Sequence, residues 1–219
     1  MKYFLTSSGL KNVDLANALS QLVNKPLSEI SVLFVPTAAN TEGSDKRWLI
    51  ENLVDFTKYE VKSIDILDIT SVPEDVWKNR FRQNDVICFG GGNEKYLAEV
   101  FDTLGMKAFL GTLGDTVYMG ISAGSMVAGV FMPQDAYPIL FPEEEDLGEI
   151  TKDGLGLCNF CFIPHLNSNY FSRVRNDALN EIQDAFTITT YAMDDETALA
   201  VENENVGIVG TGEYWMIEK

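Results

Sequence analysis

The stretch "GISAG", residues 120–124, has the G-x-S-x-G spacing that places a serine at a tight corner. The apolar run "TVYM" precedes it and small helix-forming residues follow it, so the pattern predicts a strand, a sharp turn and a helix. At such a corner the Ser122 hydroxyl would project out of the sheet. The N–H of Ala123 would face the same space and could stabilise an oxyanion. The pattern therefore indicates a nucleophile, and the alternative is a serine at an ordinary turn.

A serine hydroxyl needs a base to become a nucleophile, and His165 is the single histidine in the chain. It ends the apolar run "CFIPH" and is followed by "LNSNY", which predicts a position at a strand end beside a loop. Ligands of open parallel sheets gather at strand ends of this kind. We therefore predict that His165 is the base.

The acid that would orient the imidazole has three candidates. Asp195 and Glu196 lie in "YAMDDETALAV", and Asp135 lies in "MPQDAYPI". The α/β-hydrolases run Ser, acid, His along the chain, whereas the histidine here precedes the first two candidates. This order argues against an α/β-hydrolase unless Asp135 is the acid, and the choice among the three stays open.

A glycine loop, "FGGGN" from Phe89 to Asn93, comes directly after the apolar run "DVIC". Glycines allow positive φ and present bare N–H groups to a ligand, with a helix N-terminus just behind them. The loop lacks the GxGxxG spacing of a dinucleotide site and the lysine of a phosphate loop. We expect an N–H of this loop to join Ala123 in an oxyanion hole, and the alternative is a structural turn.

The composition bounds the remaining possibilities. With 219 residues and a formal charge of −17, from 33 acidic and 16 basic residues, the chain is expected to form one domain, residues 1–219, that does not bind nucleic acid. The absence of a long apolar run predicts no membrane span and no signal peptide, so we expect a cytoplasmic protein. The acidic run "PEEEDLGE", residues 142–149, is typical of a solvated loop.

The three cysteines do not indicate a metal site. Cys158 and Cys161 form "CNFC" ahead of His165, but no second Cys or His pair completes four ligands. We expect no metal and no disulfide framework, with Cys158 and Cys161 as buried core thiols.

Short β-rich runs alternate with amphipathic segments and would position these residues. The predicted strands are residues 2–7, 30–36, 61–67, 85–90, 116–122, 158–165, 187–193, 197–203 and 212–219. The predicted helices are residues 12–23 with Asn12 as cap, 44–59 with Ser44 as cap, 73–84 starting at Pro73, 94–114 broken near Gly105, and 169–186. Apolar strands alternating with helices predict right-handed βαβ units and a mostly parallel sheet. The last strands suggest an antiparallel annex at one sheet edge.

The motifs taken together resemble the peptidase E family, the serine aspartyl dipeptidases related to cyanophycinase. The matching pieces are "FVPTAA", "FGGGN", "GISAGS", "FIPH" and "MDDETALAV". The resemblance implies a flavodoxin-like, three-layer α/β sandwich of the class I glutamine amidotransferase type. It also implies cofactor-free peptide hydrolysis through an acyl-enzyme, with Ser122 as nucleophile and His165 as base.

By the same resemblance, Gly91, Gly92 and Ala123 would form the oxyanion hole, and the late motif places Asp195 as the acid. The stretch "MPQDAYPI" sets Asp135 one residue out of step with the family pattern. An aspartyl substrate would need a cation, for which Arg173 and Arg175 in "FSRVRND" are the candidates; Asn93 is a further candidate for substrate binding.

The function that we expect is a serine peptidase that hydrolyses short peptides, with Asp-X dipeptides as one candidate substrate. A different amidase or esterase acting through the same residues is an alternative. A non-catalytic member that binds a small ligand through the glycine loop is another. We expect no cofactor and a small peptide as partner, and we leave a homodimer open.

Overall fold

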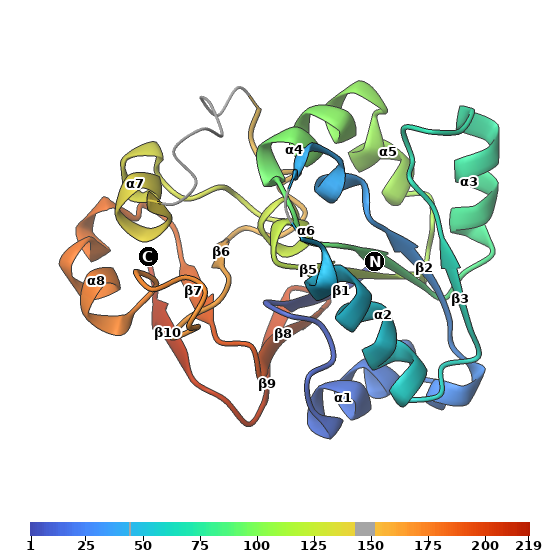
Figure 1. Ribbon diagram of the computed structural model, residues 1–219, viewed down its shortest axis with the longest axis horizontal. Helices are drawn as coiled ribbons and strands as arrows, with labels where there is room; N and C mark the ends of the chain where they lie inside the picture. Colours follow the sequence, from blue (N-terminus) through green and yellow to red (C-terminus); the bar gives the residue numbers. More distant parts are fainter. Residues whose placement is uncertain (44, 143–151) are drawn as a thin grey trace.

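The centre of the molecule is a seven-stranded sheet with the strand order β3-β2-β4-β5-β1-β8-β9, seen in the computed structural model of residues 1–43, 45–142 and 152–219 (Figure 1). The first five strands in this order run parallel, and β8 and β9 extend the sheet as antiparallel strands beside β1. The strands of this sheet are β1 (Lys2–Thr6), β2 (Ser31–Val35), β3 (Ser63–Ile66), β4 (Val86–Phe89), β5 (Val117–Ile121), β8 (Thr197–Glu202) and β9 (Asn205–Gly210).

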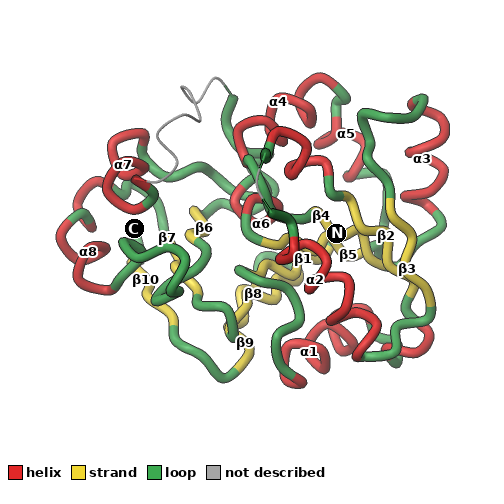
Figure 2. Tube along the Cα trace, viewed as in Figure 1, coloured by secondary structure: helices red, strands yellow, loops and turns green. Residues whose placement is uncertain are grey.

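Helices cover both faces of the sheet, which gives three layers (Figures 1 and 2). Since neighbouring residues of a strand point to opposite faces, Phe34 and Cys88 pack under α1 and α2, whereas Leu33 and Ile87 pack under the helices of the other face. Those helices are α3, α4, α5 and α6. The helices of the two faces are α1 (Val13–Val23), α2 (Arg47–Lys58), α3 (Glu74–Arg82), α4 (Glu94–Thr103), α5 (Met106–Leu110) and α6 (Ala123–Met126).

A smaller, three-stranded sheet with the order β10-β7-β6 lies beside the main sheet (Figure 2). β10 and β7 are antiparallel, and β6 and β7 are parallel. Two short helices accompany these strands, at the left of Figure 1. The elements of this part are β6 (Cys161–Ile163), β7 (Thr190–Met193), β10 (Tyr214–Ile217), α7 (Tyr137–Leu140) and α8 (Asn176–Glu181). The C-terminal strands are therefore divided between the two sheets.

The fold class predicted from the sequence is confirmed: helices surround a mostly parallel sheet, and the C-terminal strands β8, β9 and β10 pair antiparallel with their neighbours. The local predictions of a cap at Asn12 and of a break at Gly105 are also confirmed. Asn12 Oδ1 accepts a hydrogen bond from the Leu15 N–H at 2.9 Å, and Gly105 separates α4 from α5 with φ 61°. Helix caps and glycine breaks can be predicted from the sequence because they depend on residues within one turn of the chain.

Three local predictions differ from the structure. The predicted helix 169–186 is mostly loop and contains only α8 and a 3₁₀ turn at Gln183–Ala185. Strand β9 is missing from the sequence prediction. Helix α2 begins at Arg47 with Lys46 in the N-cap position, whereas Ser44, the predicted cap, lies outside the described residues. Most of the acidic run 142–149 also lies outside them. In the described part of the chain, no helix is long and apolar enough to cross a membrane.

Candidate active site

Ser122 occupies the corner between β5 and α6, where the sequence pattern predicts it. Its backbone has φ 50° and ψ −111°, a region that non-glycine residues rarely adopt. The corner is held to the neighbouring strand because the Ser122 N–H donates to the Thr6 carbonyl oxygen at 3.0 Å. The side chain of Ser122 is thus presented at the carboxyl end of the sheet.

The two glycines of the motif are needed because α6 lies almost against the sheet. A Cβ on Gly120 would lie 2.6 Å from the Ser125 backbone, and one on Gly124 would lie 2.1 Å from the Phe89 carbonyl oxygen. Both distances are far inside van der Waals contact, and both involve backbone atoms that cannot swing away. The G-x-S-x-G spacing therefore reflects close packing of the turn against β4 and β5.

We expect Gly124→Ala to lower the free energy of unfolding by about 3 kcal/mol or more, because the added methyl forces the backbone of α6 away from β4. Gly111→Ala is the matched control, since its Cβ would lie 3.4 Å from the nearest atom and its φ is −59°. Urea unfolding of both variants measures the difference. Equal stability of the two variants would contradict this account of the motif.

His165 contacts both of its predicted partners. Its Nε2 lies 3.0 Å from Ser122 Oγ, and its Nδ1 lies 2.9 Å from Asp195 Oδ1. A carboxylate can only accept, so a neutral imidazole carries its proton on Nδ1 and accepts the Ser122 hydroxyl proton at Nε2. The imidazole is 13% exposed. The three side chains form a continuous relay of hydrogen bonds.

The backbone of His165 is held by a hydroxyl that the sequence reasoning missed. His165 has φ 65°, and its N–H donates to Ser7 Oγ at 3.0 Å. The Ser7 hydroxyl in turn donates to the Met193 carbonyl oxygen at 2.8 Å. Ser7 therefore ties the turn after β6 to the ends of β1 and β7.

Of the three acids left open by the sequence, Asp195 is the one that meets the imidazole. Its Oδ1 also accepts the Ser8 hydroxyl at 2.7 Å. Burial raises the pKa of Asp195, but the hydrogen bonds from His165 and Ser8 and the charges of His165 and Lys11 outweigh it, and the net pKa is lowered. Asp195 therefore stays ionised near neutral pH.

The other two acids are exposed to solvent. Asp135 is exposed on a 3₁₀ turn at Gln134–Ala136, and Glu196 is exposed just before β8. Neither has a hydrogen bond to His165 among the described residues. The neighbouring Asp194 is used by the turn itself, since its carboxylate accepts the N–H groups of Glu196 and Glu213.

The order of the strands explains how distant residues meet. β5, β1 and β8 are neighbours in the sheet, and β8 is antiparallel to the other two. The residues after β5 and β1 and the residues before β8 therefore lie at the same edge. Ser122, Ser8 and Asp195 occupy these three positions, and His165 reaches them from the end of β6.

The glycine loop after β4 lies against Ser122. A Cβ on Gly91 would be 3.5 Å from Ser122 Cβ and 3.3 Å from the Trp48 ring, so only glycine leaves this space open. Gly92 has φ 128°, and a Cβ there would lie 2.3 Å from the Ala38 carbonyl oxygen. Among the described residues, no hydrogen bond uses the N–H of Gly91, Gly92 or Ala123.

The three predicted substrate-binding residues differ in the hydrogen bonds that their side chains form within the protein. Asn93 caps α4, with its Oδ1 accepting the Tyr96 N–H at 2.8 Å. Arg175 donates to the carbonyl oxygens of Phe171, Val174 and Ser168 at 2.8–3.0 Å, which holds the loop after His165 together. Arg173 is exposed, and no hydrogen bond or ion pair involves it within the described part of the chain.

Four side chains at this site were not predicted from the sequence: Ser7, Ser8, Trp48 and Phe171. The serines follow β1 at the carboxyl end of a central strand, and that position is the only signal that could have pointed to them. Trp48 lies on α2 beside the glycine loop, and Phe171 lies in a segment predicted to be helix. Nothing in their local sequence distinguishes these two aromatic residues from core residues.

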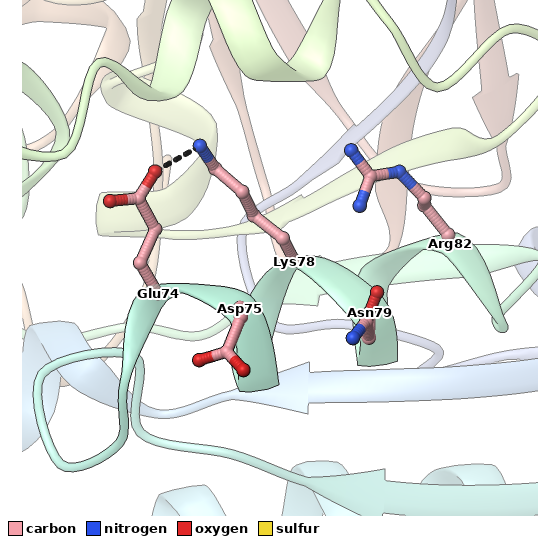
Figure 3. Close-up of a pocket in the computed structure, with 5 residues that line it drawn as sticks. All are labelled: Glu74, Asp75, Lys78, Asn79 and Arg82. Carbon is pink, nitrogen blue, oxygen red and sulfur yellow. Dashed lines mark hydrogen bonds and ion pairs between the residues drawn. The ribbon is translucent and has the colours of Figure 1, made fainter.

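A hollow on the surface adjoins the relay. It is lined by residues 166–170 and 194–196, next to Asp195. A second hollow runs along α3 and contains none of the predicted site residues (Figure 3). There Lys78 forms an ion pair with Glu74 and lies over the Phe109 ring at 5.3 Å, so its charge is already engaged.

The cysteines lie in the core, as predicted for Cys158 and Cys161. All three are buried free thiols. Burial raises the pKa of both Cys158 and Cys161 to about 12, so these thiols stay protonated at neutral pH.

A mostly parallel sheet between two layers of helices defines an α/β protein, with Ser122 at a strand–helix corner and an imidazole nitrogen 3.0 Å from its hydroxyl. The chain belongs to peptidase family S51, whose family model matches residues 3–209. The likeness to peptidase E drawn from the sequence motifs is thereby confirmed, and the family makes the chain a peptidase.

The chain also resembles proteins of known sequence and of known structure. An uncharacterized peptidase of Listeria innocua is 24% identical over 213 residues, which cover 90% of this chain and 95% of the relative. The crystal structure of a Listeria monocytogenes protein assigned provisionally to peptidase E has a TM-score of 0.75 at 20% identity, covering 96% and 98% of the two chains. A peptidase from an acI-B1 Actinobacterium has a TM-score of 0.68 at 21% identity, covering 99% of this chain and 90% of the other. The two structures show a shared fold.

Proposed function

We propose that the chain is a serine peptidase that cleaves short peptides through an acyl-enzyme. The observation that carries this proposal is the relay in which Ser122 Oγ, His165 and Asp195 are joined by contacts of 3.0 and 2.9 Å. In the first step the Ser122 oxygen attacks the peptide carbonyl carbon while its proton passes to His165 Nε2. His165 then gives this proton to the leaving amine, and water releases the acyl group by the same route.

Asp195 has two tasks in this mechanism. Its hydrogen bond to Nδ1 keeps the imidazole in the tautomer that accepts at Nε2, and its negative charge stabilises the imidazolium that forms. The lowered pKa of Asp195 suits both tasks, because the group must remain ionised throughout. Ser8 supports the acid by donating to the same oxygen.

The oxyanion would be bound by backbone N–H groups on either side of Ser122. The Ala123 N–H stands at the start of α6, and the Gly91 N–H belongs to the loop against the Ser122 side chain. Gly92 supports this loop in a conformation that a larger residue could not adopt. N–H groups without an intramolecular partner are the donors that such a hole requires.

Arg173 is the residue that we propose for binding an acidic substrate side chain. The Arg175 guanidinium is engaged by three backbone carbonyls, whereas Arg173 is exposed on the same loop. A guanidinium pairs well with a carboxylate. Asp-X dipeptides are therefore the first substrates to test, and Asn93 stays a candidate for contacts near the glycine loop.

Labelling by a fluorophosphonate together with a dipeptide panel tests the proposal. We expect one label per chain, located at Ser122 by mass spectrometry, and hydrolysis of at least part of the panel. If Arg173 binds the substrate, Arg173→Gln should raise KM for Asp-X dipeptides more than for neutral ones. Hydrolysis of esters or simple amides alone would favour the other acyl hydrolases. No labelling and no hydrolysis would favour a ligand-binding protein.

A further inference from the structure

One face of the His165 imidazole is covered by an aromatic ring. The Phe171 ring stacks on it with 4.6 Å between centroids and 17° between the ring planes. Ser122 and Asp195 contact the imidazole at its two nitrogens, in the plane of the ring. Phe171 therefore acts on the base from outside this plane.

The position of Phe171 is itself fixed from two directions. Its carbonyl oxygen accepts hydrogen bonds from Arg175 at 3.0 Å and from the Val174 N–H at 3.2 Å. Its ring packs edge-to-face with the ring of Phe141, with 5.6 Å between the ring centroids and 74° between the ring planes, and Phe141 is buried. The stacked ring is thus anchored through its backbone and its side chain, although it lies in a loop.

An anchored ring stacked on the imidazole restricts rotation about the χ2 torsion of His165. The χ2 torsion of a histidine has a broad energy minimum, so only the hydrogen bonds at the two nitrogens and the packing on the ring faces oppose small tilts of the ring. A parallel ring resists that tilt, and its negative face also favours a positive charge on the imidazole. Such a charge develops when the Ser122 proton passes to Nε2.

Resting on the proposed function, we propose that Phe171 is a positioning residue for the base. It holds the plane of the imidazole in line with Ser122 Oγ and Asp195, and it stabilises the imidazolium formed on proton transfer. It acts through His165, and the mechanism requires no contact between Phe171 and the substrate. The expected signature is therefore a loss in kcat without a loss in substrate binding.

Kinetics of Phe171→Leu and Phe171→Tyr test the inference on any peptide that the wild type hydrolyses. Leucine keeps an apolar side chain but removes the ring, and we expect kcat to fall about tenfold with KM within twofold of wild type. Tyrosine keeps the ring and should restore most of kcat. Tyr191→Leu is the matched control, because it removes a partly buried ring that packs against Phe160 at 5.2 Å. This control should leave kcat unchanged.

Because His165 is the sole histidine, its ring protons can be observed by NMR without ambiguity. A stacked aromatic ring shifts these protons upfield, so Phe171→Leu should move them downfield and Phe171→Tyr should not. The same spectra show whether each variant is folded. An unchanged kcat in folded Phe171→Leu, or a rise in KM alone, would overturn the inference and leave the proposed function standing. A wild type that is neither labelled nor active would overturn the proposed function instead.

Discussion

Replacing Ser122 with alanine is expected to lower kcat by about 10⁶-fold, because the attacking oxygen is removed and only the binding and oxyanion groups remain. His165→Ala should cost nearly as much, since the two residues act as one unit and their losses do not add. Steady-state hydrolysis of the best dipeptide, with active-site titration of the wild type, measures the change. The double variant should be no slower than either single variant.

The control for Ser122→Ala is Ser28→Ala. Ser28 is exposed in a 3₁₀ turn at Leu27–Glu29, and its replacement should leave both kcat and fluorophosphonate labelling unchanged. Labelling that persists in Ser122→Ala would place the nucleophile at another residue. In that case the relay at the carboxyl ends of β5 and β1 would have a structural role.

Replacing Asp195 with asparagine is expected to lower kcat by about 10⁴-fold with little change in KM. The amide can donate a hydrogen bond to Nδ1, which favours the tautomer with its proton on Nε2, and that tautomer cannot accept the Ser122 proton. Glu196→Gln and Asp135→Asn are the matched controls, since both carboxylates are exposed and neither has a hydrogen bond to His165 among the described residues. Each control should retain more than about a third of wild-type kcat.

The choice of acid is decided by which of these variants loses activity. A large loss in Glu196→Gln or Asp135→Asn with an active Asp195→Asn would contradict the assignment. The carboxylate of Asp195 has a second, independent signature. Its lowered pKa means that its charge stabilises the fold above the ordinary pKa of about 3.9, and this stability is lost as the pH falls through the lowered pKa. The stability difference between wild type and Asp195→Asn should therefore shrink below about pH 4.

Much of the fold was predictable because its signals are local and repeated. The apolar strands β2, β4 and β5 are buried on both faces, so their sequences are continuous apolar runs that alternate with amphipathic helices. Strand β9 was missed because most of its residues are exposed or half-buried and it contains Gly207. It pairs along one side only, with β8, and an edge strand of this kind has a weak pattern.

The segment 169–186 shows how a side-chain pattern can mislead. Phe171 and Val174 have helical spacing, which favours a helix by pattern alone. In the structure Val174 is buried, Phe171 stacks on His165, and the Arg175 guanidinium takes up carbonyls that a helix would have used. The tertiary contacts of these residues therefore override their local preference.

The residues of the candidate site that directly follow or precede a strand could be predicted from the sequence. Ser122 has a motif and His165 has no competitor, so both could be named from the sequence. The residues alone did not choose the acid, and only the family resemblance pointed to Asp195. The choice depends on which strand lies beside β1, and no local sequence pattern encodes the strand order. The supporting roles of Ser7, Ser8 and Phe171 depend on distances between segments and could not be read from the sequence.

Because β1 lies between β5 and β8, the relay can form only after the chain has been synthesised as far as β8. Tyr3 pairs with Tyr118 on one side and with Val201 on the other, so the middle of the sheet joins the two ends of the sequence. Pairings that span so much of the chain form late, because loop closure must come first. A chain still being synthesised therefore contains Ser122 long before Asp195 can reach His165. The relay is completed only when β8 docks beside β1, so a chain that stops before β8 lacks the acid of the relay.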